Sequence, residues 1–174
     1  MHLTQEDALR VAFPEPAEIE RRTAFLSDAD LGRARELAGE EVQIEGRVVT
    51  YYVGTLEGRP LGVAYFDAHR VRTLPEVLMI VVTPEARIER IEILAFKEPP
   101  EYLVPTSWLQ QIVGRRLSDE LSVKGSIVNM TGATLTSRAI TGASRRVLAL
   151  HQVIDPLDAA GPEGQEIRLE REGR

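Results

Sequence analysis

The chain has 174 residues, which fits one globular domain that buries roughly two thirds of the surface of its unfolded chain. It contains no cysteine, and this excludes disulfides, thiolate catalysis and cysteine-ligated metals. The formal net charge of −6 disfavours nonspecific binding to nucleic acid or to anionic membranes. No apolar run is long enough to span a membrane, and the N-terminal residues carry no export signal.

Residues 1–40 are predicted to form a helical N-terminal segment. Thr4 is placed to cap a short helix that ends near Phe13, just before two prolines. Ser27 is placed to cap a second helix, which ends at Gly39.

From residue 41 onward the hydrophobic pattern changes to a period of two, which is typical of strands. Short turns separate the apolar runs, so the strands are expected to pair antiparallel. The predicted strands are 42–55, 61–68, 76–83 and 88–96, and the last of them carries an irregularity in its alternation.

The chain after residue 96 is predicted to be mostly loop and helix. The proline-rich run "KEPPEYLVPTSW" is expected to lack regular structure, and Thr106 or Ser107 is expected to cap a short helix that ends at Gly114. A helix of about fifteen residues is predicted to begin near residue 136, and one apolar face identifies it. That face consists of Ile140, Ala143, Val147 and His151.

The predicted fold class is α+β, with helices packed against an antiparallel sheet. The predicted organisation is an N-terminal helical segment (1–40), a main domain (41–154) and a loose charged tail (155–174).

The run "NMTGATLTSRAITGAS" (129–144) is rich in glycine, alanine, serine and threonine and leads directly into the last predicted helix. Gly132 allows a close approach to the main chain, and the first N–H groups of a helix attract anions. Together with the hydroxyls of Thr131, Thr134, Thr136 and Ser137, these features favour a phosphate site. The alternative is a helix start whose small residues simply pack under the sheet. The spacing fits neither a P-loop nor a dinucleotide-binding fingerprint.

The run "MTGATLTSRAI" resembles the flavinylation motif of the FMN-binding domain family. That family includes flavin-carrying components of the sodium-pumping NADH:quinone reductase and of the related Rnf complex. Its motif has an Asp, two variable residues, a Ser or Thr, and then Gly-Ala-Thr. The resemblance implies that Thr131 takes the Ser or Thr position, that Gly132 and Ala133 are the small pair, and that Thr134 carries FMN through its phosphate. An FAD:FMN transferase would install the flavin.

Val128 stands where the family has its aspartate, which helps the transferase recognise its target. Valine supplies neither a charge nor a metal ligand. Three alternatives follow: Asn129 substitutes for the aspartate, FMN is held without a covalent bond, or the site has lost its function.

The resemblance also implies surroundings for the flavin. Leu135, Tyr102 and Trp108 are candidates for an apolar bed, although each fits the protein core equally well. Glu98 and Glu101 match an acidic loop that the family places near its flavin, and the alternative for them is a solvated loop.

The function implied by the resemblance is an FMN-carrying electron-transfer module that relays electrons to a membrane-bound or soluble redox partner. It is expected to work outside the cytoplasm or in the periplasm, and not as a stand-alone enzyme. The alternatives are a reversible FMN-binding domain or a non-redox scaffold domain of a membrane redox complex, and a small hydrolase-like domain. The three histidines lack the spacing of metal ligands, so no metal is expected.

Overall fold

The computed structural model describes residues 3–158. Of the predicted tail, only its first four residues (155–158) lie within this range, so the prediction for the remainder falls outside the described residues. No helix among the residues described is long and apolar enough to cross a lipid bilayer.

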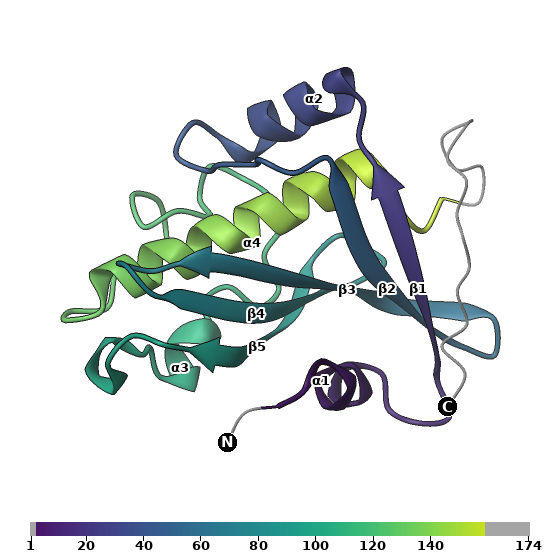
Figure 1. Cartoon of the computed structure of the whole chain (residues 1–174), viewed down its shortest axis with the longest axis horizontal. Coiled ribbons are helices and arrows are strands. Elements are labelled where there is room, and N and C mark those ends of the chain that lie inside the picture. The colour runs from purple at the N-terminus through teal and green to yellow at the C-terminus, as the bar shows by residue number, and fades with distance from the viewer. Residues whose placement is uncertain (1–2, 159–174) are drawn as a thin grey trace.

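The described residues form a five-stranded antiparallel sheet with helices on both faces (Figure 1). The α+β class predicted from the sequence is therefore confirmed. The strands lie side by side in chain order, so β1 and β5 form the two edges. The elements are α1 (Gln5–Ala12), β1 (Glu18–Phe25), α2 (Asp28–Ala38), β2 (Val48–Leu56), β3 (Arg59–Arg70), β4 (Pro75–Val82), β5 (Ile88–Phe96), the 3-10 turn η1 (Pro100–Tyr102), α3 (Thr106–Leu109) and α4 (Thr134–Ile154).

The strand β1 is absent from the sequence-based prediction, which assigned only helices to the first 40 residues. It pairs with β2 over its whole length, from Glu18 opposite Thr55 to Phe25 opposite Val48. Its sequence, EIERRTAF, has few apolar residues and no regular alternation, because an edge strand tolerates long charged side chains. The usual strand signal is therefore missing.

The pairing between β2 and β3 covers only part of the two strands. It runs from the turn up to Tyr51 opposite Tyr65, and beyond this point the strands diverge. From Phe66 to Arg70, β3 is paired with β4 alone. The irregularity predicted in the last strand is also present, since the β4–β5 register shifts twice.

The apolar run of β4 contributes side chains to the hydrophobic clusters on both faces of the sheet. Leu78, Ile80 and Val82 pack on the α4 side, whereas Met79 and Val81 pack on the α1 side. All five side chains are fully buried. Burying one such side chain contributes about 1.5–3 kcal/mol, so β4 anchors both layers of helices.

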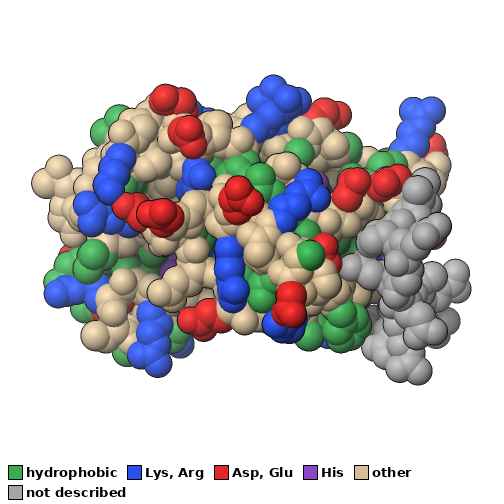
Figure 2. Space-filling model, turned by 90° about the horizontal axis from the view of Figure 1, so that it is seen from above, with side chains coloured by type: hydrophobic (Ala, Val, Ile, Leu, Met, Phe, Trp, Pro, Cys, Tyr) green, Lys and Arg blue, Asp and Glu red, His purple; other side chains and the backbone are tan. Residues whose placement is uncertain are grey.

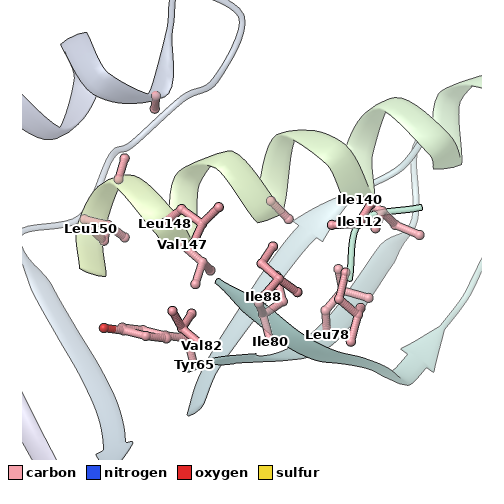
Figure 3. Close-up of a cluster of buried hydrophobic side chains, with 14 of the residues drawn as sticks. Tyr65, Leu78, Ile80, Val82, Ile88, Ile112, Ile140, Val147, Leu148 and Leu150 are labelled. Atoms are coloured by element: carbon pink, nitrogen blue, oxygen red, sulfur yellow. The ribbon is translucent and has the colours of Figure 1, made fainter. Parts of the chain in front are cut away.

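Helix α4 covers one face of the sheet, with α2 beside it (Figure 1). The face predicted from Ile140, Ala143, Val147 and His151 is buried, as expected. Figure 3 shows side chains of this helix pointing toward those of β3, β4 and β5.

Helix boundaries differ from the prediction at two places. Helix α4 has 21 residues and begins at Thr134, so it is longer than expected and includes residues 134–144 of the small-residue stretch. Helix α3 has only four residues, and neither Thr106 nor Ser107 caps it, because Pro105 occupies the N-cap position. The proline-rich loop before it contains one turn of 3-10 helix.

Gly54 in β2 faces the ring of Phe13, the residue that follows α1. A Cβ atom at Gly54 would stand 2.3 Å from the fully buried ring of Phe13. We predict that Gly54→Ala lowers the free energy of unfolding by about 1–3 kcal/mol, because the ring has to shift inside a packed core. Urea denaturation measures this change.

The matched control is Gly32→Ala in α2, where a Cβ meets nothing within 4 Å. That variant should gain about 0.5–1 kcal/mol. Equal stability of the two variants would contradict the packing described.

Candidate functional site

The start of α4, the η1 turn and the loop 71–74 between β3 and β4 lie at the same end of the molecule (Figure 1). We call this loop the 71–74 loop. Contacts described below join these three segments, so most of the site residues predicted from the sequence are brought together here.

Thr134 is the first residue of α4 and is half-buried. Gly132, two residues earlier, has a φ of +85°, and a Cβ atom on it would meet nothing within 4 Å. The side-chain amide of Asn129 donates to the Thr134 hydroxyl at 3.3 Å. Thr131 is exposed and Ala133 is buried. The hydroxyl of Thr134 thus lies at an open helix start. Beside it lies the side-chain amide of Asn129, the residue that the sequence suggested only as a substitute for the aspartate of the family.

The next two hydroxyls are engaged inside the protein. Thr136 donates to the backbone carbonyl of Tyr102 at 2.6 Å. Ser137 donates to the carbonyl of Ala133 at 2.9 Å and accepts from the N–H of Met130. Both side chains are buried, so they fix the turn before α4, and a flavin contact for them stays a prediction.

Trp108 holds the segment in front of the helix. Its ring is buried, and its Nε1–H donates to the carbonyl of Val128 at 2.8 Å. The side chain of Gln111 accepts from the N–H of Val128 at 2.8 Å. The Val128 side chain itself is 70% exposed. The residue in the position of the family's aspartate therefore faces solvent, while its backbone is fixed.

Glu98 anchors the 71–74 loop. One of its carboxylate oxygens accepts from the backbone N–H groups of Arg72, Thr73 and Leu74 at 2.8–3.1 Å. The hydrogen bonds from Leu74 and Thr73 lower the pKa of Glu98, so the carboxylate is ionised at neutral pH. Glu101, the other acidic candidate, is exposed.

Tyr102 connects this loop to α4. The Arg72 guanidinium lies over its ring, 4.8 Å from the ring centre, while the Tyr102 carbonyl accepts from Thr136. Sequence reasoning missed Arg72, because nothing in its local sequence separates it from the other surface arginines.

Exposed apolar side chains surround the start of α4. Leu74, Leu103, Val128 and Leu135 are each between 42% and 70% exposed. A groove of about 580 Å³ lies between β5 and the segment 98–113, and of these four side chains Leu103 lines it. A groove of this size is in the range of small-molecule sites.

The face over α2 and α4 has hollows of its own: one of about 380 Å³ is lined by residues of both helices, and one of about 660 Å³ lies at the end of α2. Figure 2 shows acidic and basic side chains interspersed there, without a continuous field of one sign. In residues 3–158 no group of three or more His, Cys, Asp or Glu side chains is placed to hold a metal ion.

A buried charge cluster lies under α4. His69 contacts Asp67 at 2.9 Å and Glu76 at 2.8 Å, and Arg146 from α4 forms two hydrogen bonds with Asp67. Burial alone would lower the pKa of His69, but the hydrogen bonds and charges of Asp67 and Glu76 outweigh it and raise this pKa to about 9. The imidazole is therefore charged at neutral pH. His151, buried against the Tyr65 hydroxyl, has its pKa lowered by burial to about 4.

Comparison with known protein families identifies a flavin-related segment. The family model of the FMN-binding domain matches residues 75–149, from the start of β4 into α4. No characterised protein and no solved structure matches the chain. The matched segment includes the Gly-Ala-Thr run at the start of α4, together with Glu98, Tyr102 and Trp108. The likeness indicates flavin binding by this part of the chain.

The charged state of His69 predicts a loss of stability at alkaline pH. The pKa of His69 is higher in the folded protein than in the unfolded chain, so its contribution is complete below about pH 6.5 and is lost as the pH rises through about 9. Wild type should therefore be more stable than His69→Gln at pH 6, and this difference should shrink by pH 10. Chemical denaturation of both proteins across this range measures it. A difference that stays constant with pH would show that folding does not raise the pKa of His69.

Proposed function

We propose that this chain is an electron-transfer flavoprotein module that carries FMN on Thr134 through a phosphoester. The observation that carries the proposal is the match of the FMN-binding domain family to residues 75–149, which contain the Gly-Ala-Thr run. The narrower likeness to the flavin-carrying components of the sodium-pumping NADH:quinone reductase and of the Rnf complex is part of the same proposal.

The start of α4 fits the phosphate of FMN. The first N–H groups of a helix lack carbonyl partners within it, and they carry a partial positive charge. Gly132 leaves the approach to the main chain open, and the Thr134 hydroxyl is the first one that the helix presents. The phosphoester would keep one negative charge, which the helix start stabilises.

Attachment requires an outside enzyme, because a threonine hydroxyl is a weak nucleophile at neutral pH. In the proposed reaction, the Thr134 oxygen attacks the FMN phosphorus of FAD. The new P–O bond forms, the bond to AMP breaks, the hydroxyl proton is released, and AMP leaves. An FAD:FMN transferase is the modifying partner in this proposal.

The bound flavin would supply the electron-transfer chemistry, and the chain would bind and orient it. Leu135 and Leu103 are exposed beside the attachment point, as an apolar bed for the flavin ring requires. Trp108 supports this bed from beneath rather than from its surface, since its ring is buried and bonded to the segment before α4.

The proposed partners are redox proteins, either membrane-bound or soluble, that exchange electrons with the flavin. The proposed location is outside the cytoplasm, as in the family that the motif resembles. Exposed apolar residues at this end of the molecule are consistent with the close approach that electron transfer between proteins needs.

Replacing the attachment residue should abolish covalent flavin. The experiment is co-expression of the full chain with an FAD:FMN transferase, followed by the intact mass of the denatured protein. Wild type should gain the mass of one FMN less one water, mapped to the peptide that contains Thr134. Thr134→Ala should gain nothing, because no hydroxyl remains at the start of the helix.

The control is Ser118→Ala, which removes an exposed hydroxyl outside the motif and should still be loaded. Flavin that stays bound to denatured Thr134→Ala protein would contradict the assignment of Thr134 as the attachment residue. Absence of any gain in wild type, with the transferase active on a standard target, would rule out the covalent bond.

Restoring the aspartate of the family should improve loading. Val128 is exposed and its backbone is held by Trp108 and Gln111, so Val128→Asp should be accommodated without disturbing the turn. We predict that this variant is flavinylated faster than wild type, as measured by the fraction of loaded protein over time.

Asn129→Ala is expected to be flavinylated more slowly than wild type, since it lacks the amide that contacts the Thr134 hydroxyl. No change in either variant would mean that the segment 128–129 plays no part in the transfer.

The second candidate is reversible FMN binding by the same site, and the exposed valine at position 128 favours it. In that case the purified protein is yellow but turns colourless after acid precipitation, with FMN recovered in the supernatant. A scaffold role without redox chemistry corresponds to a protein that takes up no FMN in either test.

A further inference from the structure

The 71–74 loop brings a cation to the site that the proposed function does not use. Arg72 is exposed, and its guanidinium lies 4.8 Å from the centre of the Tyr102 ring. Its side chain forms no ion pair with another residue that the structure describes. The ionised carboxylate of Glu98 attracts this guanidinium without forming an ion pair with it.

The position of Arg72 is fixed through its backbone. The buried carboxylate of Glu98 accepts from the N–H of Arg72 and from those of the next two residues. Hydrogen bonds to an ionised acceptor are about twice as strong as neutral ones. Because one oxygen of the Glu98 carboxylate accepts hydrogen bonds from three consecutive backbone N–H groups, the 71–74 loop is held in one defined conformation.

The same cation lies close to the proposed attachment point. Tyr102 carries Arg72 on its ring and accepts, through its carbonyl, from Thr136 at 2.6 Å. Thr136 is two residues beyond Thr134 in the first turn of α4, a rise of about 3 Å along the helix axis. One tyrosine therefore separates the guanidinium from the first turn of the helix.

We infer that Arg72 is the cationic group beside the flavin ring, and that the loop anchored on Glu98 holds it there. This inference rests on the proposed function, since it requires FMN at Thr134. Arg72 lies outside the matched segment 75–149, so the family likeness does not assign it a role.

The chemistry of the ring explains why a cation belongs there. Reduction adds negative charge to the isoalloxazine, and a nearby guanidinium stabilises that charge more than it stabilises the oxidised ring. A guanidinium is planar and stays charged at every accessible pH, and it stacks on aromatic surfaces. Arg72 thereby favours the reduced flavin.

The test compares loaded Arg72→Gln with loaded wild type, both as the full chain. At a fixed potential set by a reference dye, the ratio of reduced to oxidised flavin should fall by about three- to tenfold in the variant, because one charge near the ring is lost. Arg72→Lys keeps the charge and should recover most of this ratio.

The matched control is Arg59→Gln. Arg59 is the exposed first residue of β3, next to the β2–β3 turn at the opposite end of the sheet, so this variant loses the same net charge far from the start of α4 (Figure 1). Its ratio should equal that of wild type. Hydrogen exchange at Thr73 and Leu74 checks the loop. These amides should stay protected in Arg72→Gln, because Glu98 and not the arginine side chain holds them.

Each result decides the matter. A lower ratio in Arg72→Gln alone, with the amides still protected, supports the inference. An unchanged ratio in a loaded Arg72→Gln protein overturns it and leaves the proposed function intact. The same drop in Arg59→Gln overturns it as well, since net charge would then explain the effect. If wild type takes up no FMN, the proposed function fails first and the inference fails with it.

Discussion

The packing of α4 on the sheet is the interaction on which the rest of this structure depends. The helix lies close because its buried positions include small residues, among them Thr141, Ala143 and Ser144. Their hydroxyls bond to carbonyls one turn back, as Thr141 does to Ser137 and Ser144 does to Ile140. Polar side chains thus enter the core with their hydrogen bonds satisfied, and the helix loses little by carrying them. This explains most of the small-residue stretch without any ligand.

The candidate site lies at the N-terminal end of α4, where the helix is not covered by the sheet packing described above. Packing fixes where α4 begins, and the hydrogen bond from Thr136 to Tyr102 fixes the loop beside it. The packing of small residues under the sheet, one of the two alternatives drawn from the sequence, accounts for the buried positions of the helix, and a phosphate site at its start stays a prediction. The buried positions belong to the core, whereas Gly132 and Thr134 stand at the open end.

Sequence patterns were sufficient where burial leaves a periodic signal. The run of β4 and the buried face of α4 were both predicted, because one alternates between two cores and the other repeats with the helical period. The patterns failed at β1, where an edge position permits charged residues, and at α3, where Pro105 displaced the expected hydroxyl cap. The motif pointed to Thr134, but Arg72 meets Tyr102 because Glu98, far away in the sequence, holds the 71–74 loop, so Arg72 had no signal in its own segment.

The divergence of β2 from β3 has a consequence for how the sheet holds together. Beyond Tyr51 and Tyr65 no backbone ladder joins the two strands, and Arg146 from α4 bridges them instead. Its guanidinium binds Asp67 on β3 and donates to the carbonyl of Gln43, in the segment that leads into β2. The backbone ladder thus joins β2 and β3 between their turn and Tyr51, and the Arg146 side chain adds a link between them beyond it. Because both side chains of this ion pair are largely buried, salt screens their attraction much less than it screens an exposed pair.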